Sequence, residues 1–376
     1  SLGGDSVPRA EYEAIVRKSN DLEQELHRQI SIVQSHETGP GNNQIERMCV
    51  MALPAAVSAL HSLSEETGHA SSATWALVRA EDYVAHLASS RYPLSIPELV
   101  NTITNGANPQ GNEAERNRIM VDTQDACLAM SVISWDPEGR NMLLCDSRTV
   151  PSLLRIVAQS AGIHSKIDTS GNNAWGALQV PAQVVCSRFA AMTLGNFSLD
   201  EGGRLSIVRD ADAMSVLLEA ISGDDTDTSS FSLLCAGNLF MISEARQRFL
   251  TMGDAVQTIF NKLSSGEAMT IRFAAGAVRN FAADDACREA VTKVRGSVAI
   301  LQELSRNMNP RIRDHAEHAL FNLRMLRHGG TGGGGSVHST PVFGSETPRG
   351  TSAQSVQQGD NRSAFENIGA NLFGMA

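Results

Sequence analysis

Four kinds of side chain recur in this chain at an interval of 42 residues. The Asn column is Asn196, Asn238, Asn280 and Asn322. A Phe column (Phe189, Phe231, Phe273), an Arg column (Arg204, Arg246, Arg288) and an aliphatic column (Leu217, Ile259, Leu301) keep the same spacing. Four columns with one period indicate an internal repeat, and a period of this length is typical of solenoids built from stacked units.

Each repeat divides into a short helix, a second helix and a longer third helix that ends close to the Asn. Small residues such as Ala190, Ala236 and Gly237 lie in the third helix, where they let neighbouring helices approach closely. One unit cannot bury its own apolar face, so units must stack. We therefore predict an all-α solenoid of about six or seven three-helix units over residues 44–328, clearest over residues 120–328.

The register is less regular upstream. The segment CLAMSVISWDPEGRNMLL, which starts at Cys127, matches the stretch from a third helix to the next first helix, with Ser134 in place of Asn. Ser134 and Asn196 are 62 residues apart, 20 more than the period. The excess falls in a Gly-, Asn- and Ser-rich segment, and we predict an insertion loop at residues 162–179.

The two ends of the chain differ from the repeats. Residues 1–43 include an amphipathic segment, Tyr12–Gln34, that is predicted to cap the array, with a coiled-coil seam as the alternative. Residues 329–336 (GGTGGGGS) have the composition of flexible linkers used to join two proteins.

Residues 337–376 carry no core pattern, and we interpret them as a fused partner peptide, with a native disordered tail as the alternative. An extended ligand segment would use Pro341, Val342, Phe343 and Pro348, and a short C-terminal helix would use Phe365, Ile368 and Leu372.

The units resemble armadillo repeats, the family of β-catenin, importin-α and plakophilin. The resemblance depends on the 42-residue period, on third helices that end in LGNF, AGNL, VRNF and LFNL, and on the acidic turn and Arg that follow. It implies a right-handed solenoid with a concave groove lined by third helices. In that groove Asn196, Asn238, Asn280 and Asn322 would hydrogen-bond the backbone of an extended peptide. A carboxamide suits this role because it both donates and accepts. The alternative is that each Asn caps or bridges within its own repeat.

The chain departs from importin-α-like arrays at the position one helical turn before the Asn. Those arrays place Trp there, whereas this chain has Met192, Leu234, Gly276 and His318. We therefore do not expect it to recognise basic nuclear-import signals.

The Phe column lies two turns before the Asn column and on nearly the same helix face. Phe189, Phe231 and Phe273 either form apolar pockets for a ligand or pack between adjacent third helices; we favour the pockets, because the tail supplies apolar side chains.

Two sets of Arg residues accompany these columns. Arg188, Arg272 and Arg279 are predicted to give the groove a local positive patch. The Arg204, Arg246 and Arg288 column is predicted to be structural, pairing with Glu201, Glu244 and Asp285 in the preceding turns.

Composition excludes several other functions. The net charge of −10 disfavours a nucleic-acid binder, and no run of 18 apolar residues suggests a membrane span. We expect no secretory signal, and six scattered cysteines favour reduced thiols in the cytosol, with the nucleus as an alternative.

Catalytic motifs are not found. The chain has no phosphate-binding Gly-rich loop, no nucleophile elbow and no zinc-protease motif. His315, Glu317 and His318 are too few for a zinc site. We therefore expect no cofactor and no metal, and predict a non-enzymatic scaffold or adaptor whose partner is a protein. The alternative is a nuclear-transport or chromatin-associated armadillo protein.

Overall fold

The computed structural model of the chain describes Met48, Ala52 and residues 95–161 and 182–328. Within these ranges the regular elements are α-helices, without a strand. The helices α4 (Ile96–Gly106) and α5 (Glu113–Ile133) come first. The predicted N-terminal cap, insertion loop, linker and tail lie outside the described residues, and so does most of residues 44–94.

Four complete three-helix units follow in the described residues. Their bounds are α6 (Pro137–Leu144), α7 (Thr149–Ala161) and α8 (Ala182–Phe197); α9 (Glu201–Val208), α10 (Ala213–Ser222) and α11 (Thr226–Leu239); α12 (Ser243–Leu250), α13 (Ala255–Lys262) and α14 (Ala268–Phe281); and α15 (Asp285–Lys293), α16 (Ser297–Leu304) and α17 (Pro310–His328).

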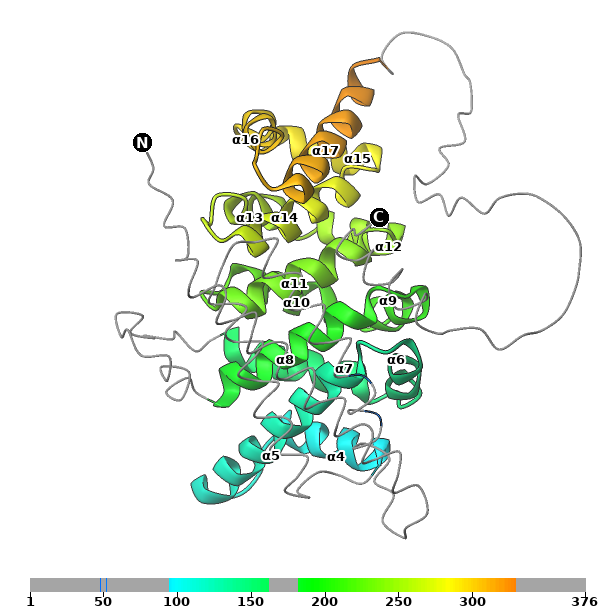
Figure 1. Ribbon diagram of the computed structural model, residues 1–376, viewed down its shortest axis with the longest axis vertical. Helices are drawn as coiled ribbons and strands as arrows, with labels where there is room; N and C mark the ends of the chain where they lie inside the picture. The colour runs from blue at the N-terminus through cyan, green and yellow to red at the C-terminus, as the bar shows by residue number, and fades with distance from the viewer. Residues whose placement is uncertain (1–47, 49–51, 53–94, 162–181, 329–376) are drawn as a thin grey trace, which may run out of the picture.

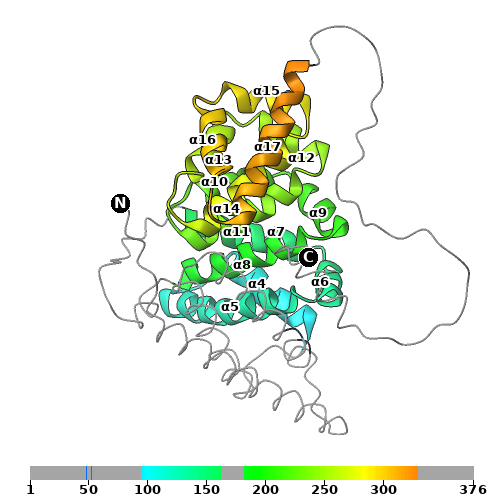
Figure 2. The same cartoon turned by 45° about the horizontal axis from the view of Figure 1, so that its top comes forward.

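The units stack in chain order. Successive third helices pack against one another along the series α5, α8, α11, α14 and α17, and α4 packs on α5 as the second helix of a preceding unit. The stack runs from α4 and α5 at one end to α17 at the other (Figure 1), and the third helices keep this order in the turned view (Figure 2). The predicted all-α solenoid of stacked three-helix units is therefore confirmed over the described residues.

Short polar side chains cap the start of several helices. Asn112 accepts a hydrogen bond from the backbone of Glu115, whose carboxylate accepts one from the backbone of Asn112, so the two form a capping box. Asp136 accepts from Gly139 N at 2.7 Å, directly before Pro137 at the first position of α6.

Two glycines lie where backbones approach closely. A Cβ at Gly237 would lie 3.1 Å from Cα of Ala277, so α11 and α14 touch at their backbones. A Cβ at Gly203 would lie 1.9 Å from the carbonyl oxygen of Phe197, so α9 can turn back onto the end of α8 only with glycine there.

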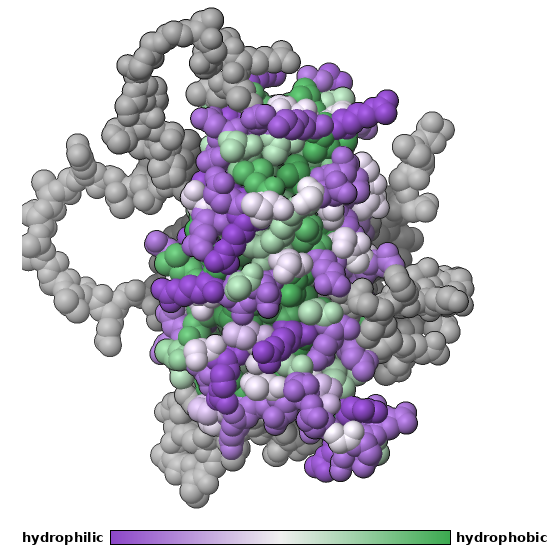
Figure 3. Space-filling view, turned by 180° about the vertical axis from the view of Figure 1, so that it is seen from behind, coloured by the Kyte–Doolittle hydropathy of each residue, from purple (hydrophilic) through white to green (hydrophobic). Residues whose placement is uncertain are grey.

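The core is continuous through the stack. Leu217, Ile259 and Leu301, the aliphatic column, lie in the second helices and are buried. Phe240, Phe249 and Phe281 form an aromatic cluster that joins two units, with ring centroids 4.8–5.6 Å apart. The face opposite to that of Figure 1 shows apolar patches among polar side chains (Figure 3).

Candidate functional site

The Asn side chains link each third helix to the one before it. Asn238 Nδ2 donates to Ser198 Oγ at 2.9 Å, Asn280 Nδ2 donates to the Gly237 carbonyl at 2.8 Å, and Asn322 Nδ2 donates to the Arg279 carbonyl at 3.1 Å. These bonds run between units, whereas the sequence suggested only a bridge within one repeat as the alternative to ligand binding. They fix the orientation of each carboxamide.

Part of each carboxamide remains available. Asn238, Asn280 and Asn322 are half-buried, and their Oδ1 atoms accept none of the hydrogen bonds found among the described residues. Each can therefore still accept a hydrogen bond through Oδ1 and donate a second through Nδ2. Whether they bind a peptide stays a prediction.

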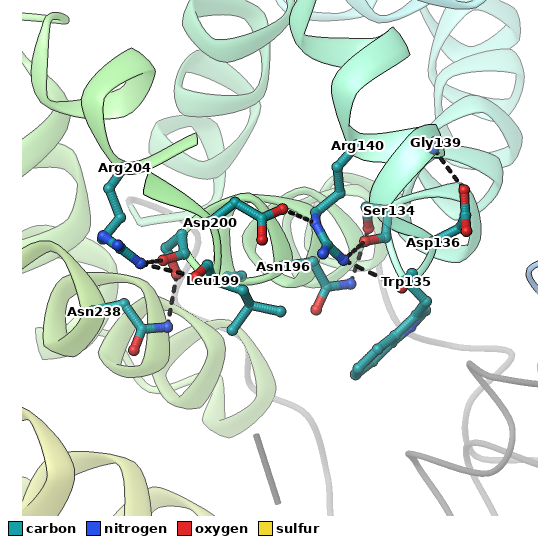
Figure 4. A network of polar contacts seen from close by, with 12 residues as sticks. Ser134, Trp135, Asp136, Gly139, Arg140, Asn196, Leu199, Asp200, Arg204 and Asn238 are labelled. Carbon is teal, nitrogen blue, oxygen red and sulfur yellow. Dashed lines mark hydrogen bonds and ion pairs between the residues drawn. The ribbon is translucent and has the colours of Figure 1, made fainter. Parts of the chain in front are cut away.

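Asn196 differs from the other three. It is buried, its Nδ2 donates to Ser134 Oγ at 2.9 Å, and its Oδ1 is buried without a hydrogen-bond partner. This bond has the same form as the one from Asn238 to Ser198 (Figure 4).

The match of Ser134 to the Asn column is wrong by two residues. The last residues of α5 and α8 are Ile133 and Phe197, so Ser134 corresponds to Ser198 and the Asn196 position corresponds to Val132. Gly139 confirms this register, because its Cβ would lie 2.3 Å from the carbonyl of Ile133, just as Gly203 meets Phe197. The sequence match failed because the insertion hides the true offset.

The Phe column packs between helices. Phe189, Phe231 and Phe273 are only 2%, 3% and 7% exposed, and the rings of Phe231 and Phe273 lie 6.5 Å apart. The burial of these rings supports packing between adjacent third helices and contradicts the pocket-lining role that we favoured from the sequence. A position on the same helix face as Asn does not make a side chain accessible to a ligand, because adjacent third helices cover that part of the face.

Arg188 is neutralised within the fold. Its Nη2 lies 2.6 Å from Asp225 Oδ1, and its Nε lies 3.6 Å from Asp227 Oδ2. Burial lowers the pKa of Arg188, but its hydrogen bond to Asp225 and the charges of Asp227 and Asp225 outweigh burial and raise it overall. Burial also raises the pKa of Asp227 to about 6, despite the opposing charge of Arg188. This Arg adds no positive potential to the third-helix face.

Arg272 and Arg279 lie near the junction of α14 and α17. Arg272 is buried, with its guanidinium 5.8 Å from the centroid of the Phe273 ring. Arg279 Nη1 lies 3.3 Å from His315 Nδ1 and 3.8 Å from Asp314 Oδ2. The structure thus places these two Arg residues in one region and Arg188 in another, so the predicted patch is divided.

The repeating Arg column closes the ends of the third helices. Arg204 Nη1 donates to the carbonyls of Ser198 and Leu199, at 3.1 and 2.8 Å, as Figure 4 shows. Arg246 and Arg288 donate in the same way to Phe240 and to Ala282 and Ala283. These carbonyls have no partner within their own helix, so a cation beside them is favourable.

The predicted acidic partners of this column are mostly different. Arg288 does pair with Asp285, but Glu244 pairs with Arg248 instead, at 2.6 Å. The column is structural as predicted, although its main acceptors are backbone carbonyls rather than carboxylates. Arg140 also belongs to it, since its Nη1 donates to Ser134 O and its Nε pairs with Asp200.

Three further observations concern metal binding, the cysteines and membrane spans. No group of three His, Cys, Asp or Glu residues in the described part of the chain is placed to hold a metal ion. The five cysteines described are free thiols, of which Cys145 is exposed and the other four are buried. None of the helices described is long and apolar enough to cross a membrane.

Asp225, Asp227, His315 and Ser198 are the neighbours that sequence reasoning missed. Asp225 could have been found as a helix N-cap, because it precedes Thr226–Leu239 and accepts from Thr228 N. His315 carries no comparable signal, because its neighbour Arg279 comes from another repeat.

Comparison with solved structures gives similar architectures at low identity. A designed armadillo repeat protein is 15% identical with a TM-score of 0.46, and the match covers 75% of this chain and 99% of that one. A designed armadillo repeat protein in complex with peptide (KR)4 is also 15% identical, with a TM-score of 0.45 and the same coverage. UNC-45 from Drosophila melanogaster is 13% identical with a TM-score of 0.35, covering 80% of this chain and 52% of that one. No protein-family profile and no curated protein matches the chain.

Proposed function

We propose that this chain is a non-enzymatic scaffold or adaptor that binds an extended peptide segment of a partner protein along its third helices. The observation that carries the proposal is the anchored Asn column. Asn238, Asn280 and Asn322 each use one amide hydrogen within the solenoid and keep Oδ1 and a second N–H for a ligand.

An extended peptide needs such partners. Its backbone presents N–H and C=O groups that lose water on binding and must be hydrogen-bonded. A carboxamide already held by the preceding helix loses little side-chain entropy when a ligand arrives, which favours affinity. These hydrogen bonds recognise only the peptide backbone, so any preference for a peptide sequence must come from neighbouring side chains.

The tail is part of the proposal as a ligand in the same chain. Residues 337–376 follow the Gly-rich segment 329–336, whose composition supports a flexible tether. A short tether of this kind gives an effective concentration of roughly millimolar. Residues Pro341 to Phe343 would then supply an extended apolar segment.

The test is a selection of decapeptides on the full chain, followed by titration against variants. Replacing Asn238, Asn280 and Asn322 together with Ala should weaken binding of the selected peptides by at least tenfold, because buried peptide groups lose partners. Matched controls are Gln257→Ala and Gln302→Ala, which change exposed carboxamides on the second helices α13 and α16.

Each titration is repeated with the chain ended at residue 328, because the tail would use the same Asn residues, compete more weakly in the triple variant and mask part of the loss. Equal binding by the triple variant and the controls would contradict the proposal. The proposal would also be contradicted if the affinity of every selected peptide were unchanged by substitution at all five positions.

A further inference from the structure

Arg204 and Asn238 meet at Ser198, the residue that follows α8. Arg204 Nη1 donates to the Ser198 carbonyl at 3.1 Å, and Asn238 Nδ2 donates to Ser198 Oγ at 2.9 Å (Figure 4). Arg204 and Asn238 are both half-buried, so part of each side chain faces solvent. A peptide group held by Asn238 would therefore lie next to a guanidinium.

The same arrangement one unit earlier includes a carboxylate. There Asn196 Nδ2 donates to Ser134 Oγ at 2.9 Å, and Arg140 Nη1 donates to the Ser134 carbonyl at 3.0 Å. The Nε atom of Arg140 lies 2.5 Å from Asp200 Oδ2, which neutralises the guanidinium. Asp200 is the N-cap residue of α9, in the next unit, and its side chain is 43% exposed. The carboxylate of this ion pair therefore lies at the surface of the stack.

The next unit lacks this carboxylate. The N-cap residue of α12, which corresponds to Asp200, is Ile242, and its side chain packs against the hydrophobic core. One unit later the N-cap residue is again an aspartate, Asp284 of α15, at the place that corresponds to Arg246. Arg204 is thus the Arg whose counter-ion the following unit does not supply.

The charge of Arg204 is not paired within the described part of the chain. The hydrogen bonds of Arg204 there are the two from Nη1 to backbone carbonyls, and it forms no ion pair, not even with the neighbouring Glu201. Its Nε and Nη2 atoms donate to none of the described residues, and neither is buried. The Nε–H group that in Arg140 binds Asp200 is therefore available to a ligand.

We propose that Arg204 binds an acidic side chain, Asp or Glu, of the extended peptide, next to the peptide group that Asn238 holds. The inference rests on the proposed function and names one side chain of its ligand. The ligand carboxylate would pair with Arg204 as Asp200 pairs with Arg140. Hydrogen bonds between a guanidinium and a carboxylate are about twice as strong as neutral ones, so Asp and Glu should be preferred to Asn and Gln.

One acidic residue fits the chain better than an acidic run. The net charge of −10 repels a ligand with many carboxylates, whereas the attraction of Arg204 acts over a Debye length of about 8–10 Å. Asp200 and Asp284 would also repel further carboxylates in the units on either side. The segment 337–350 of the tail meets this requirement, because its one acidic residue is Glu346.

The experiment repeats the selection of decapeptides on the full chain and then compares three forms of one selected peptide. We expect the selection to enrich Asp or Glu at one position. With Glu there the peptide should bind about fivefold more tightly than with Gln, and with Lys it should bind most weakly. The ratio between the Glu and Gln forms should fall as salt is added. The tail competes equally with all three forms on one protein, so it does not change this ratio.

A pair of substitutions at Ile242 leaves Arg204 in place. Ile242→Asp restores the carboxylate of the preceding unit and should bring the Glu and Gln forms to nearly equal affinity. Ile242→Asn is the matched control, because it loses the same apolar contacts but adds no charge, and it should keep the preference for Glu. Both residues are favoured at an N-cap, so α12 should form in both variants.

A second pair tests the Arg itself. Arg204→Gln should abolish the preference for Glu, whereas Arg246→Gln should keep it. The two changes remove the same kind of hydrogen bond to the carbonyls at the end of a third helix, so their structural effects are matched. Melting curves establish that all four variants fold.

Equal affinity for the Glu and Gln forms would overturn the inference, and so would a selection that enriches no acidic residue. A preference for Glu that survives in both Ile242→Asp and Arg204→Gln would place the acidic side chain elsewhere and overturn it too. If the selected peptides depend on the Asn column while Glu and Gln bind equally, only this site is lost and the proposed function stands. If neither dependence is seen, both are wrong.

Discussion

Each Asn of the column divides its carboxamide between the fold and the open face of the third helices. At Asn238 the two roles can be separated, because its acceptor within the fold is a side chain, Ser198 Oγ, rather than a carbonyl. The sequence predicted the column from its spacing but not this bond. Ser198 belongs to the preceding repeat, and only the packing of α8 against α11 brings it to Asn238.

Asn238→Ala should lower the free energy of unfolding by about 1 kcal/mol, the usual net value of one hydrogen bond. Ser198→Ala should cost at least as much, because Ser198 Oγ also donates to the Gly195 carbonyl. In a double-mutant cycle measured by urea unfolding, the double variant should lose less free energy of unfolding than the sum of the two single losses. Strict additivity would mean that the bond contributes nothing to stability.

The pH dependence of stability should contain two opposing contributions. The pKa of His315 is depressed to about 3 in the fold, so its contribution is complete above the unfolded value of 6.5 and is lost as pH falls towards 3. The pKa of Asp227 is raised to about 6, so its contribution is complete below the unfolded value of 3.8 and is lost as pH rises towards 6. Between pH 4 and 6 the two slopes oppose each other.

Single substitutions should reveal each slope. Relative to the wild-type chain, the stability of His315→Gln should decrease as pH rises from 4 to 6, because the rising contribution of His315 has been removed. The stability of Asp227→Asn should increase relative to wild type over the same interval. Denaturant unfolding at several pH values measures both differences, and two flat differences would show that neither group is perturbed.

Packing between third helices decides the role of the Phe column at the scale of whole elements. The sequence could place Phe231 on the face of Asn238, but whether a neighbouring helix covers that face depends on how closely the helices approach. Gly237 and Ala277 allow α11 and α14 to touch, and this approach buries Phe231 and Phe273 together. The spacing of residues along one helix does not show how closely a neighbouring helix approaches it.

Phe231→Ala should therefore destabilise the full chain by about 3–5 kcal/mol, as expected for a buried ring. The matched control is Phe321→Ala on α17, because that ring is 60% exposed and should cost little. Thermal and denaturant unfolding compare the two. A stable Phe231→Ala variant with weakened peptide binding would instead support the pocket-lining role.

The solenoid over the described residues was predictable because each unit repeats the same contacts with its neighbours. The period located α8 to α17 from the Asn, Arg and aliphatic columns, and it failed where residues 162–181 interrupt it. The candidate site was less predictable. The pairs formed by Arg188 with Asp225 and by Arg279 with His315 join residues 37 and 36 positions apart, which no motif within one repeat can show.

The length of the anchored column also limits the ligand. Neighbouring packed helices are about 8–10 Å apart, so the two intervals from Asn238 to Asn322 span about 16–20 Å. An extended chain advances about 3.3–3.6 Å per residue, so about five to six residues match the column. Affinity of truncated forms of a selected peptide should therefore rise up to about six residues and then level off in isothermal titration.

A backbone control separates this from side-chain recognition. The same six-residue peptide with alternate backbone nitrogens methylated keeps every side chain but loses the N–H groups that would donate to the Asn Oδ1 atoms. Methylation on the register that faces Asn238 and Asn280 should abolish binding, whereas methylation on the other register should be tolerated better, since neighbouring N–H groups of an extended chain point in opposite directions. Equal effects of both registers, or an affinity that two or three residues already supply, would contradict a ligand held from Asn238 to Asn322.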